Sequence, residues 1–69
     1  MTIGERIEYN LKLCYMTRAD LSAEANIPRQ VLYAYIKGKC QPSVKYLPQI
    51  ADALGVTIDY LVRGDENED

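Results

Sequence analysis

The side chains best suited to bind a partner gather in one stretch of the sequence, residues 17–38. Pro28 can open a helix there, because its fixed φ suits the first helical turn. Leu32, Tyr35 and Ile36 would share the buried face of that helix at a spacing of three and four residues. The residues left on its outward face are Arg29, Gln30, Tyr33, Ala34 and Lys37. Apart from Ala34, they offer hydrogen bonds and positive charge, which is the chemistry of a binding surface.

Catalytic and metal chemistry are not indicated in the sequence. There is no histidine, and no serine, cysteine or carboxylate pair has an evident partner, so we expect that the chain is not an enzyme. Cys14 and Cys40 lie far apart without Cys-x-x-Cys spacing, so we expect no metal site and no cofactor. We interpret Cys14 as a core residue and Cys40 as a free loop thiol. A disulfide between them is the less favoured alternative, because nothing indicates an oxidising compartment.

The net charge of −2 conceals an uneven distribution. Four of the ten acidic residues stand in the last five positions, whereas residues 17–45 contain five basic residues and two acidic ones. The basic residues of this middle part are Arg18, Arg29, Lys37, Lys39 and Lys45. A locally basic surface suits a phosphate-bearing partner. The alternative is an ordinary solvated face, which is the commoner explanation of such a cluster.

Length and composition predict one small domain. At 69 residues the core must be compact, and no room is left for a ligand-sensing domain, so we expect no small-molecule ligand. No apolar run approaches the length of a membrane span, and the first residues lack the apolar region of a signal peptide. We therefore expect a cytoplasmic protein without a membrane partner.

A capping box, Thr2 with Glu5, predicts a first helix over residues 3–15. The residues expected in the core from this segment and just after it are Ile3, Ile7, Tyr9, Leu11, Leu13, Cys14 and Met16. Asn10 falls close to the apolar stripe, so its amide must find a partner or lie at the edge of the core.

The same logic predicts two short helices around a turn. Thr17 with Asp20 resembles another capping box, which favours a helix over residues 18–25. Asn26 then tolerates the left-handed conformation that ends a helix. The helix opened by Pro28 can be terminated by Gly38.

Two further helices are predicted after the loop at 38–42. Ser43 is a good N-cap, but Pro48 would delete a hydrogen bond from a regular helix begun there, at a cost of about 3 kcal/mol. The fourth helix therefore either starts later, near Tyr46 or Leu47, or opens with a distorted first turn. Thr57 precedes a fifth, short helix ending at residues 63–64, and the acidic tail at 65–69 is expected to be disordered.

The chain resembles the lambda-repressor-like helix-turn-helix family, of the Cro and repressor (XRE) type, over residues 3–64. The matching segments are IGERI, T-R-x-D-L, L-Y-x-Y-I-K-G-K, P-S with IADALGV, and DYL. Each segment is weak alone, but their order and spacing are specific. The resemblance implies an all-α, compact five-helix domain over residues 1–64, with the helix-turn-helix at its second and third helices.

The resemblance also implies roles for individual residues. The third helix would lie in the DNA major groove, and its base-reading residues would be Arg29, Gln30, Tyr33 and Ala34. Arg can pair with guanine and Gln with adenine, while Ala can touch a thymine methyl group. The phosphate-binding residues would be Thr17, Arg18, Lys37, Lys39 and Lys45. The dimer surface would contain Tyr60, Leu61 and Val62, although these residues also suit the closing of the core.

Several residues depart from the family pattern. Ile36 stands where a glutamate usually pairs with the arginine of the IGERI segment, so we expect Arg6 to bind Asp52 or solvent instead. Pro28 replaces the usual hydroxyl cap of the third helix, and Asn10 replaces a usual leucine.

We therefore expect a bacterial or phage-encoded transcriptional regulator, a repressor that binds a palindromic operator in double-stranded DNA as a homodimer. One recognition helix covers only a few base pairs, so a monomer would bind weakly. The alternative is a protein-interaction module of the same fold, like an antitoxin or anti-repressor, which the net negative charge would suit.

Overall fold

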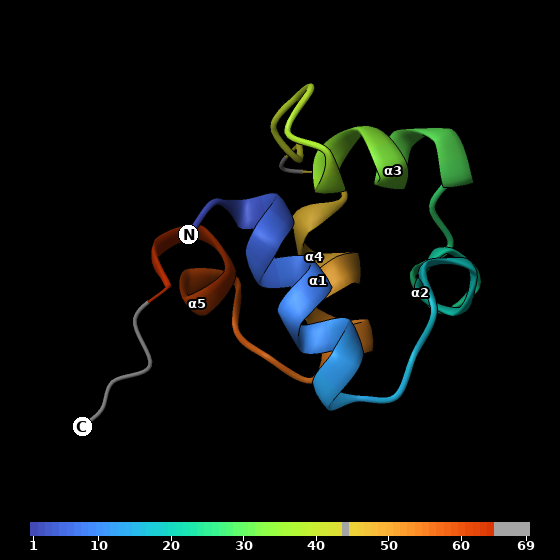
Figure 1. The fold of residues 1–69 in the computed structure, drawn as a ribbon, viewed down its shortest axis with the longest axis horizontal. Helices are drawn as coiled ribbons and strands as arrows, with labels where there is room; N and C mark the ends of the chain where they lie inside the picture. The colour runs from blue at the N-terminus through green and yellow to red at the C-terminus, as the bar shows by residue number, and fades with distance from the viewer. Residues whose placement is uncertain (44, 65–69) are drawn as a thin grey trace.

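The computed structural model describes residues 1–43 and 45–64, and the acidic tail predicted at 65–69 lies outside the described residues. Within them the chain forms five helices joined by short loops (Figure 1). These are α1 (Ile3–Leu13), α2 (Arg18–Ala25), α3 (Arg29–Ile36), α4 (Leu47–Leu54) and α5 (Ile58–Arg63). The predicted all-α class and helix number are confirmed. No helix of the described residues is long and apolar enough to cross a bilayer.

Side-chain caps fix where three of the helices begin. The Thr2 hydroxyl accepts from the Glu5 N–H at 3.1 Å, and the Glu5 carboxylate accepts from the Thr2 N–H at 2.9 Å. Thr17 and Asp20 form the same reciprocal pair at 3.0 Å in both directions. Thr57 caps α5 by accepting from the backbone N–H three residues later. These contacts satisfy N–H groups that have no acceptor inside the helix, so both predicted capping boxes are confirmed.

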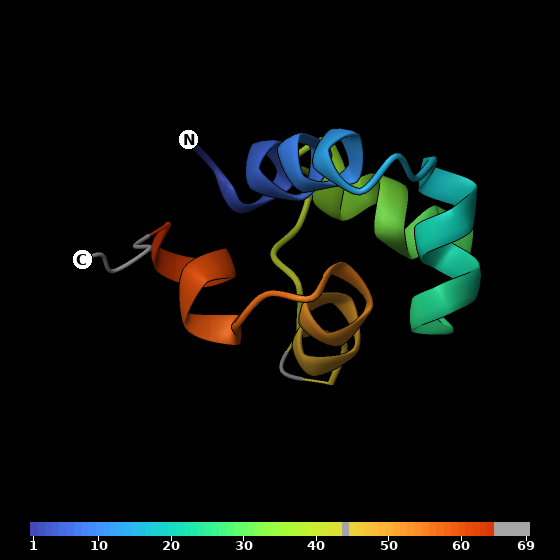
Figure 2. The ribbon, with the colours of Figure 1, turned by 90° about the horizontal axis from the view of Figure 1, so that it is seen from below.

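The helices enclose one core, to which each contributes. α1 lies against α3 and α5, while α4 lies against α2 and α5 (Figure 2). In both views α2 and α5 stand at opposite ends of the molecule. The largest fully buried side chains come one from each helix: Ile7, Leu21, Leu32, Ile50 and Leu61. A core shared in this way fixes α3 against the rest of the domain.

The predicted end of α1 and part of its predicted core were wrong. The helix ends at Leu13, and Tyr15 turns the chain with a left-handed φ of 55° while its side chain is 96% exposed. Tyr9 and Leu13 are about half exposed, and Cys14 is an exposed free thiol like Cys40. The cause is the register of the buried face, which passes through positions 6–7 and 10–11 and leaves 9 and 13 toward solvent.

Two buried positions of α1, 6 and 10, are occupied by polar side chains. Arg6 is 7% exposed and donates to the backbone carbonyls of Leu61 and, at 2.8 Å, Met1. The expectation that Arg6 binds Asp52 or solvent was therefore wrong. Asn10 is buried, and its amide donates to the Arg6 carbonyl and to the Tyr60 hydroxyl, both at 2.9 Å. Hydrogen bonds from these two side chains thus join α1 to α5 inside the core.

The start of α4 shows how Pro48 is accommodated. The N–H groups of Tyr46 and Leu47 donate to the Ser43 carbonyl at 3.0 Å, which forms a single turn ahead of the helix. α4 then begins at Leu47, with Pro48 in its first turn, where no intrahelical N–H bond is lost. The later start is confirmed, and Ser43 as the N-cap was wrong.

Candidate nucleic-acid interface

The turn between α2 and α3 is held by backbone and side-chain hydrogen bonds. Asn26 ends α2 in the left-handed conformation, with φ 58° and ψ 49°, as predicted. Ile27 buries its side chain, and its N–H and carbonyl both bond to Ser22, at 3.0 and 2.5 Å. From α4, the Gln49 amide donates to the Ala25 carbonyl at 2.5 Å. α2 appears end-on in Figure 1 while α3 runs across the picture, so the two helices cross steeply.

α3 begins without a side-chain cap. Pro28 occupies the N-cap position, and its carbonyl accepts from the N–H groups of Val31 and Leu32 at 3.0 and 3.1 Å. The N–H groups ahead of these have no acceptor within the helix, and no acidic side chain stands in the first turn. This end of α3 therefore presents a partial positive charge.

The outward face of α3 carries the residues predicted to read bases. Arg29 and Gln30 are exposed in the first turn, and Tyr33 and Ala34 follow one turn later, half-buried at the edge of the core. Since these positions are separated by three and four residues, they lie on one side of the helix. Lys37 extends the same side at the helix end. The structure thus brings this set together.

A glycine turn places two lysines beyond α3. The Gly38 N–H donates to the Tyr35 carbonyl at 3.1 Å, and the Lys39 N–H donates to the Ala34 carbonyl at 2.9 Å. This is a Schellman motif, which requires the φ of +79° that Gly38 adopts. Lys37 and Lys39 are both exposed, on either side of the glycine.

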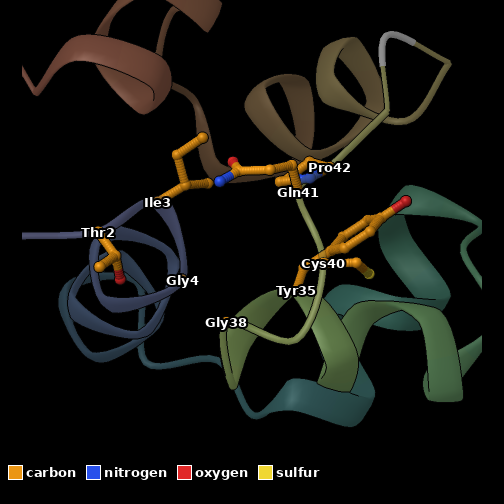
Figure 3. A pocket seen from close by; sticks show the side chains of 8 residues that line it. All are labelled: Thr2, Ile3, Gly4, Tyr35, Gly38, Cys40, Gln41 and Pro42. Atoms are coloured by element: carbon orange, nitrogen blue, oxygen red, sulfur yellow. The ribbon is translucent and has the colours of Figure 1, made fainter.

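α1 approaches the end of α3 so closely that only glycine fits at position 4. A Cβ on Gly4 would stand 2.6 Å from the Tyr35 carbonyl oxygen and would also meet the Ile36 carbonyl. A small pocket opens beside this contact, lined by Thr2, Ile3, Gly4, Tyr35, Gly38, Cys40, Gln41 and Pro42 (Figure 3). Among the residues that the structure describes, no lysine, arginine, aspartate or glutamate lines it. The pocket therefore lacks the charge that a phosphate ligand would need.

Arg18 is held by contacts that the sequence analysis missed. Its Nε and Nη2 donate to the two carboxylate oxygens of Glu8, each at 3.0 Å. Its guanidinium carbon also lies 5.5 Å from the centre of the Tyr33 ring. Arg18 lowers the pKa of Glu8 below its ordinary value of 4.5, mainly through this hydrogen bonding, and Glu8 raises the pKa of Arg18. A signal was available, because an arginine at the positive N-terminal end of a helix favours an acidic partner.

The remaining predicted phosphate contacts lie at the ends of helices. Thr17 is exposed, with its hydroxyl engaged in capping α2. Lys45 is exposed, and its ammonium group lies 5.3 Å from the centre of the Tyr46 ring. Tyr46 in turn faces Tyr35 of α3, with ring centres 6.4 Å apart. Lys45 is thereby connected to α3 through two aromatic rings.

The predicted dimer surface needs one correction. Leu61 is fully buried in the core of the monomer, so its side chain is not available to a partner. Tyr60 is half-buried with its hydroxyl bonded to Asn10, whereas Val62 is 46% exposed. Ile58, which the prediction omitted, is 42% exposed and stands four residues before Val62 on the same side of α5.

A family match agrees with this geometry. A model of the helix-turn-helix family matches residues 7–61, which is more than half of the chain. The chain belongs to the Cro/C1-type helix-turn-helix family. The family predicted from the sequence motifs is thus confirmed.

Relatives of this helix-turn-helix domain include two from Bacillus and its phages. It is 35% identical over 63 residues to an uncharacterized HTH-type transcriptional regulator, YqaE, of Bacillus subtilis (strain 168), covering 86% of this chain and 54% of that protein. It is 33% identical over 62 residues to the immunity repressor protein of Bacillus phage phi105, covering 90% of this chain and 43% of that protein. The chain thus spans about half the length of the curated relatives it matches.

Solved structures of similar fold include two DNA-binding proteins. The P22 c2 repressor in complex with a synthetic operator has a TM-score of 0.87 and 25% identity, covering 94% of this chain and 98% of that one. The N-terminal DNA-binding domain of SinR from Bacillus subtilis has a TM-score of 0.83 and 24% identity, covering 97% and 96%. The fold is therefore that of known DNA-binding domains.

Proposed function

We propose that this domain binds DNA in a sequence-specific manner and acts as a transcriptional repressor. The observation that carries the proposal is the outward face of α3, where Arg29 and Gln30 are exposed in the first turn and lysines stand at the other end. Both curated relatives are described as regulators or repressors, and the P22 c2 repressor was solved on a synthetic operator. In this arrangement α3 enters the major groove and α2 crosses the backbone.

Base reading is assigned to the first two turns of α3. Arg29 has the fork of donors that matches the two acceptors of guanine, and Gln30 can both donate to and accept from adenine. Ala34 is small enough to contact a thymine methyl group, and Tyr33 lies beside it. Each good bidentate contact contributes about 1–3 kcal/mol of discrimination against the wrong base.

Phosphate binding is assigned to the cations and the helix terminus around this face. Lys37 and Lys39 flank the turn after α3, Lys45 lies beyond the loop, and Thr17 marks the N-terminal end of α2. Such contacts set the orientation on the duplex without reading its sequence. They also allow a chain of net negative charge to bind an anionic partner, because the attraction is local.

We infer that the domain acts in the cytoplasm as a homodimer, which binds a palindromic operator in double-stranded DNA. Ile58 and Val62 form an exposed apolar pair on α5, at the end of the molecule opposite α2 (Figure 1). A two-fold pairing of such surfaces would present two copies of α3 to half-sites about 34 Å apart. Substitution Val62→Asp is expected to weaken operator binding and to leave the fold intact, since Val62 is about half exposed.

Selection from random duplexes at low salt tests the function. The expected result is an enriched motif with two-fold symmetry. The Arg29→Ala and Gln30→Ala variants are expected to select duplexes without this base preference. The competing function is a protein-interaction module, favoured by the net charge of −2 and by the exposed Tyr9 and Leu13 on α1. If no motif is enriched, DNA recognition is refuted and the interaction module takes its place.

A further inference from the structure

One contact links three helices on the side of α3 that the proposed function uses. Glu8 comes from α1, Arg18 is the first residue of α2, and Tyr33 stands on the outward side of α3. Both carboxylate oxygens of Glu8 accept hydrogen bonds from the Arg18 guanidinium at 3.0 Å. The guanidinium carbon lies 5.5 Å from the centre of the Tyr33 ring. The two hydrogen bonds from Glu8 therefore fix the position and orientation of the guanidinium, and the Tyr33 ring packs against it.

The geometry has two consequences for DNA binding. Tyr33 stands four residues after Arg29 and three after Gln30, so whatever holds its ring also sets the surface next to the base-reading residues. Glu8 also neutralises Arg18 at the N-terminus of α2, where a bare cation is disfavoured by the helix dipole, so the Arg18 side chain itself adds no net attraction for a phosphate. The pKa of Glu8 is lowered, so its carboxylate is charged at neutral pH.

We propose that Glu8 is a specificity-determining residue, which clamps Arg18 against Tyr33 and so positions the Tyr33 ring beside the base-reading residues. Arg18 then acts as a positioning residue rather than as a phosphate contact. This inference rests on the proposed function, because it assigns a part of the DNA-binding face. It predicts that loss of the Glu8 carboxylate lowers sequence discrimination and strengthens attraction to any duplex.

The test compares four variants with the wild-type domain. Glu8→Gln removes the charge that holds Arg18, and Arg18→Lys keeps the positive charge but loses the fork and the flat face. Tyr33→Leu identifies the base pair at which Tyr33 acts. Glu24→Gln is the matched control, because Glu24 is an exposed acidic residue of α2 and gives the same change in net charge. Glu8 and Arg18 side chains are 33% and 38% exposed, so each variant is expected to fold, which thermal unfolding verifies.

Two quantities are measured for each variant: the motif enriched from random duplexes, and the slope of log affinity against log salt on a random-sequence duplex. Glu8→Gln is expected to lose about fivefold or more in discrimination at the base pair affected by Tyr33→Leu. Its salt slope is expected to steepen by about 0.9, because Arg18 becomes free to bind a phosphate. Arg18→Lys is expected to lose the same discrimination with the slope unchanged, and Glu24→Gln to change neither quantity.

Different results overturn different claims. If the wild-type domain selects a motif but Glu8→Gln behaves like Glu24→Gln, the role of Glu8 is refuted while the proposed function stands. If Arg18→Lys keeps full discrimination, Arg18 does not position Tyr33. If the wild-type domain enriches no motif, the proposed function fails and this inference fails with it.

Discussion

The two ends of the molecule handle polar groups in opposite ways. Around α2 and α3, charged and hydrogen-bonding side chains are exposed, and the turn between the helices is braced by Gln49. Between α1 and α5, a guanidinium and an amide are buried, while Tyr9 and Leu13 of α1 are exposed. The first region keeps its polar groups available to a partner, whereas the second uses them to join two helices. We therefore expect substitutions in the two regions to change different properties.

The largest effect is expected for Arg6→Ala. The substitution leaves the Leu61 carbonyl without its donor, creates a cavity and separates α1 from α5. The free energy of unfolding is expected to fall by about 2–4 kcal/mol. Urea denaturation followed by circular dichroism measures it. Arg63→Ala is the control, because Arg63 is exposed and pairs at 3.6 Å with an exposed Asp59, so its loss should cost less than about 0.5 kcal/mol. Equal losses in the two variants would contradict the structural role of Arg6.

The next effect concerns Gly4, where α1 meets the end of α3. Replacing glycine by alanine inside a helix normally stabilises by about 0.5–1 kcal/mol. At this position the added Cβ meets two backbone carbonyls, which cannot turn away, so Gly4→Ala is expected to destabilise by about 1–3 kcal/mol. The midpoint of urea unfolding checks the sign. A midpoint shifted to higher urea would contradict the close approach of α1 to the end of α3.

Substitutions on α3 are expected to change DNA binding while stability stays within about 0.5 kcal/mol. Arg29→Ala and Gln30→Ala should each lose about 1–3 kcal/mol of discrimination at one base pair. Lys37→Ala should weaken binding to all sequences alike and reduce the salt slope by about 0.9. Titrations of the selected motif and a scrambled duplex at several salt concentrations separate the two patterns. Uniform weakening by all three variants would refute base reading by Arg29 and Gln30.

The smallest effect is the pH dependence of the Glu8–Arg18 pair. Because the pKa of Glu8 is lower in the folded chain than the ordinary 4.5, the pair stabilises the fold above that value. The stabilisation is lost as the pH falls through the folded-state pKa. Glu8→Gln is therefore expected to be slightly less stable than wild type at pH 7 and equal to it once the pH has fallen below the folded-state pKa of Glu8. Thermal unfolding across this range measures the difference, with Glu24→Gln as the control. A difference that persists at the acid end would exclude the ion pair as its cause.

Local signals allowed much of the fold to be predicted from sequence. The capping boxes at Thr2 and Thr17, the left-handed Asn26 and the glycine after α3 each depend on residues close in the chain. For the same reason the outward face of α3 was correctly identified, since helical spacing alone determines which residues share a side.

The errors concern contacts between distant residues. Arg6 looks like a surface residue by type, so the buried stripe of α1 was widened with the apolar residues Tyr9 and Leu13 instead. Asn10 was expected near the stripe with a partner for its amide, and this is confirmed. The hydrogen bonds between Glu8 and Arg18 join two helices. An arginine at a helix N-terminus favours an acidic partner, but no pattern close in the chain indicates which one. Burial of Leu61 likewise depends on how α5 packs, which is decided by the whole core.

Amide chemical shifts of the isotope-labelled domain, recorded during titration with its selected duplex, test most directly whether α3 forms the DNA-binding face. The largest changes are predicted at Thr17, in residues 29–34 and around Lys37 to Lys39. The amides of Tyr9 and Leu13, on the exposed side of α1, are predicted to change little. Changes centred on Tyr9 and Leu13, with α3 unaffected, would contradict the assignment of the interface.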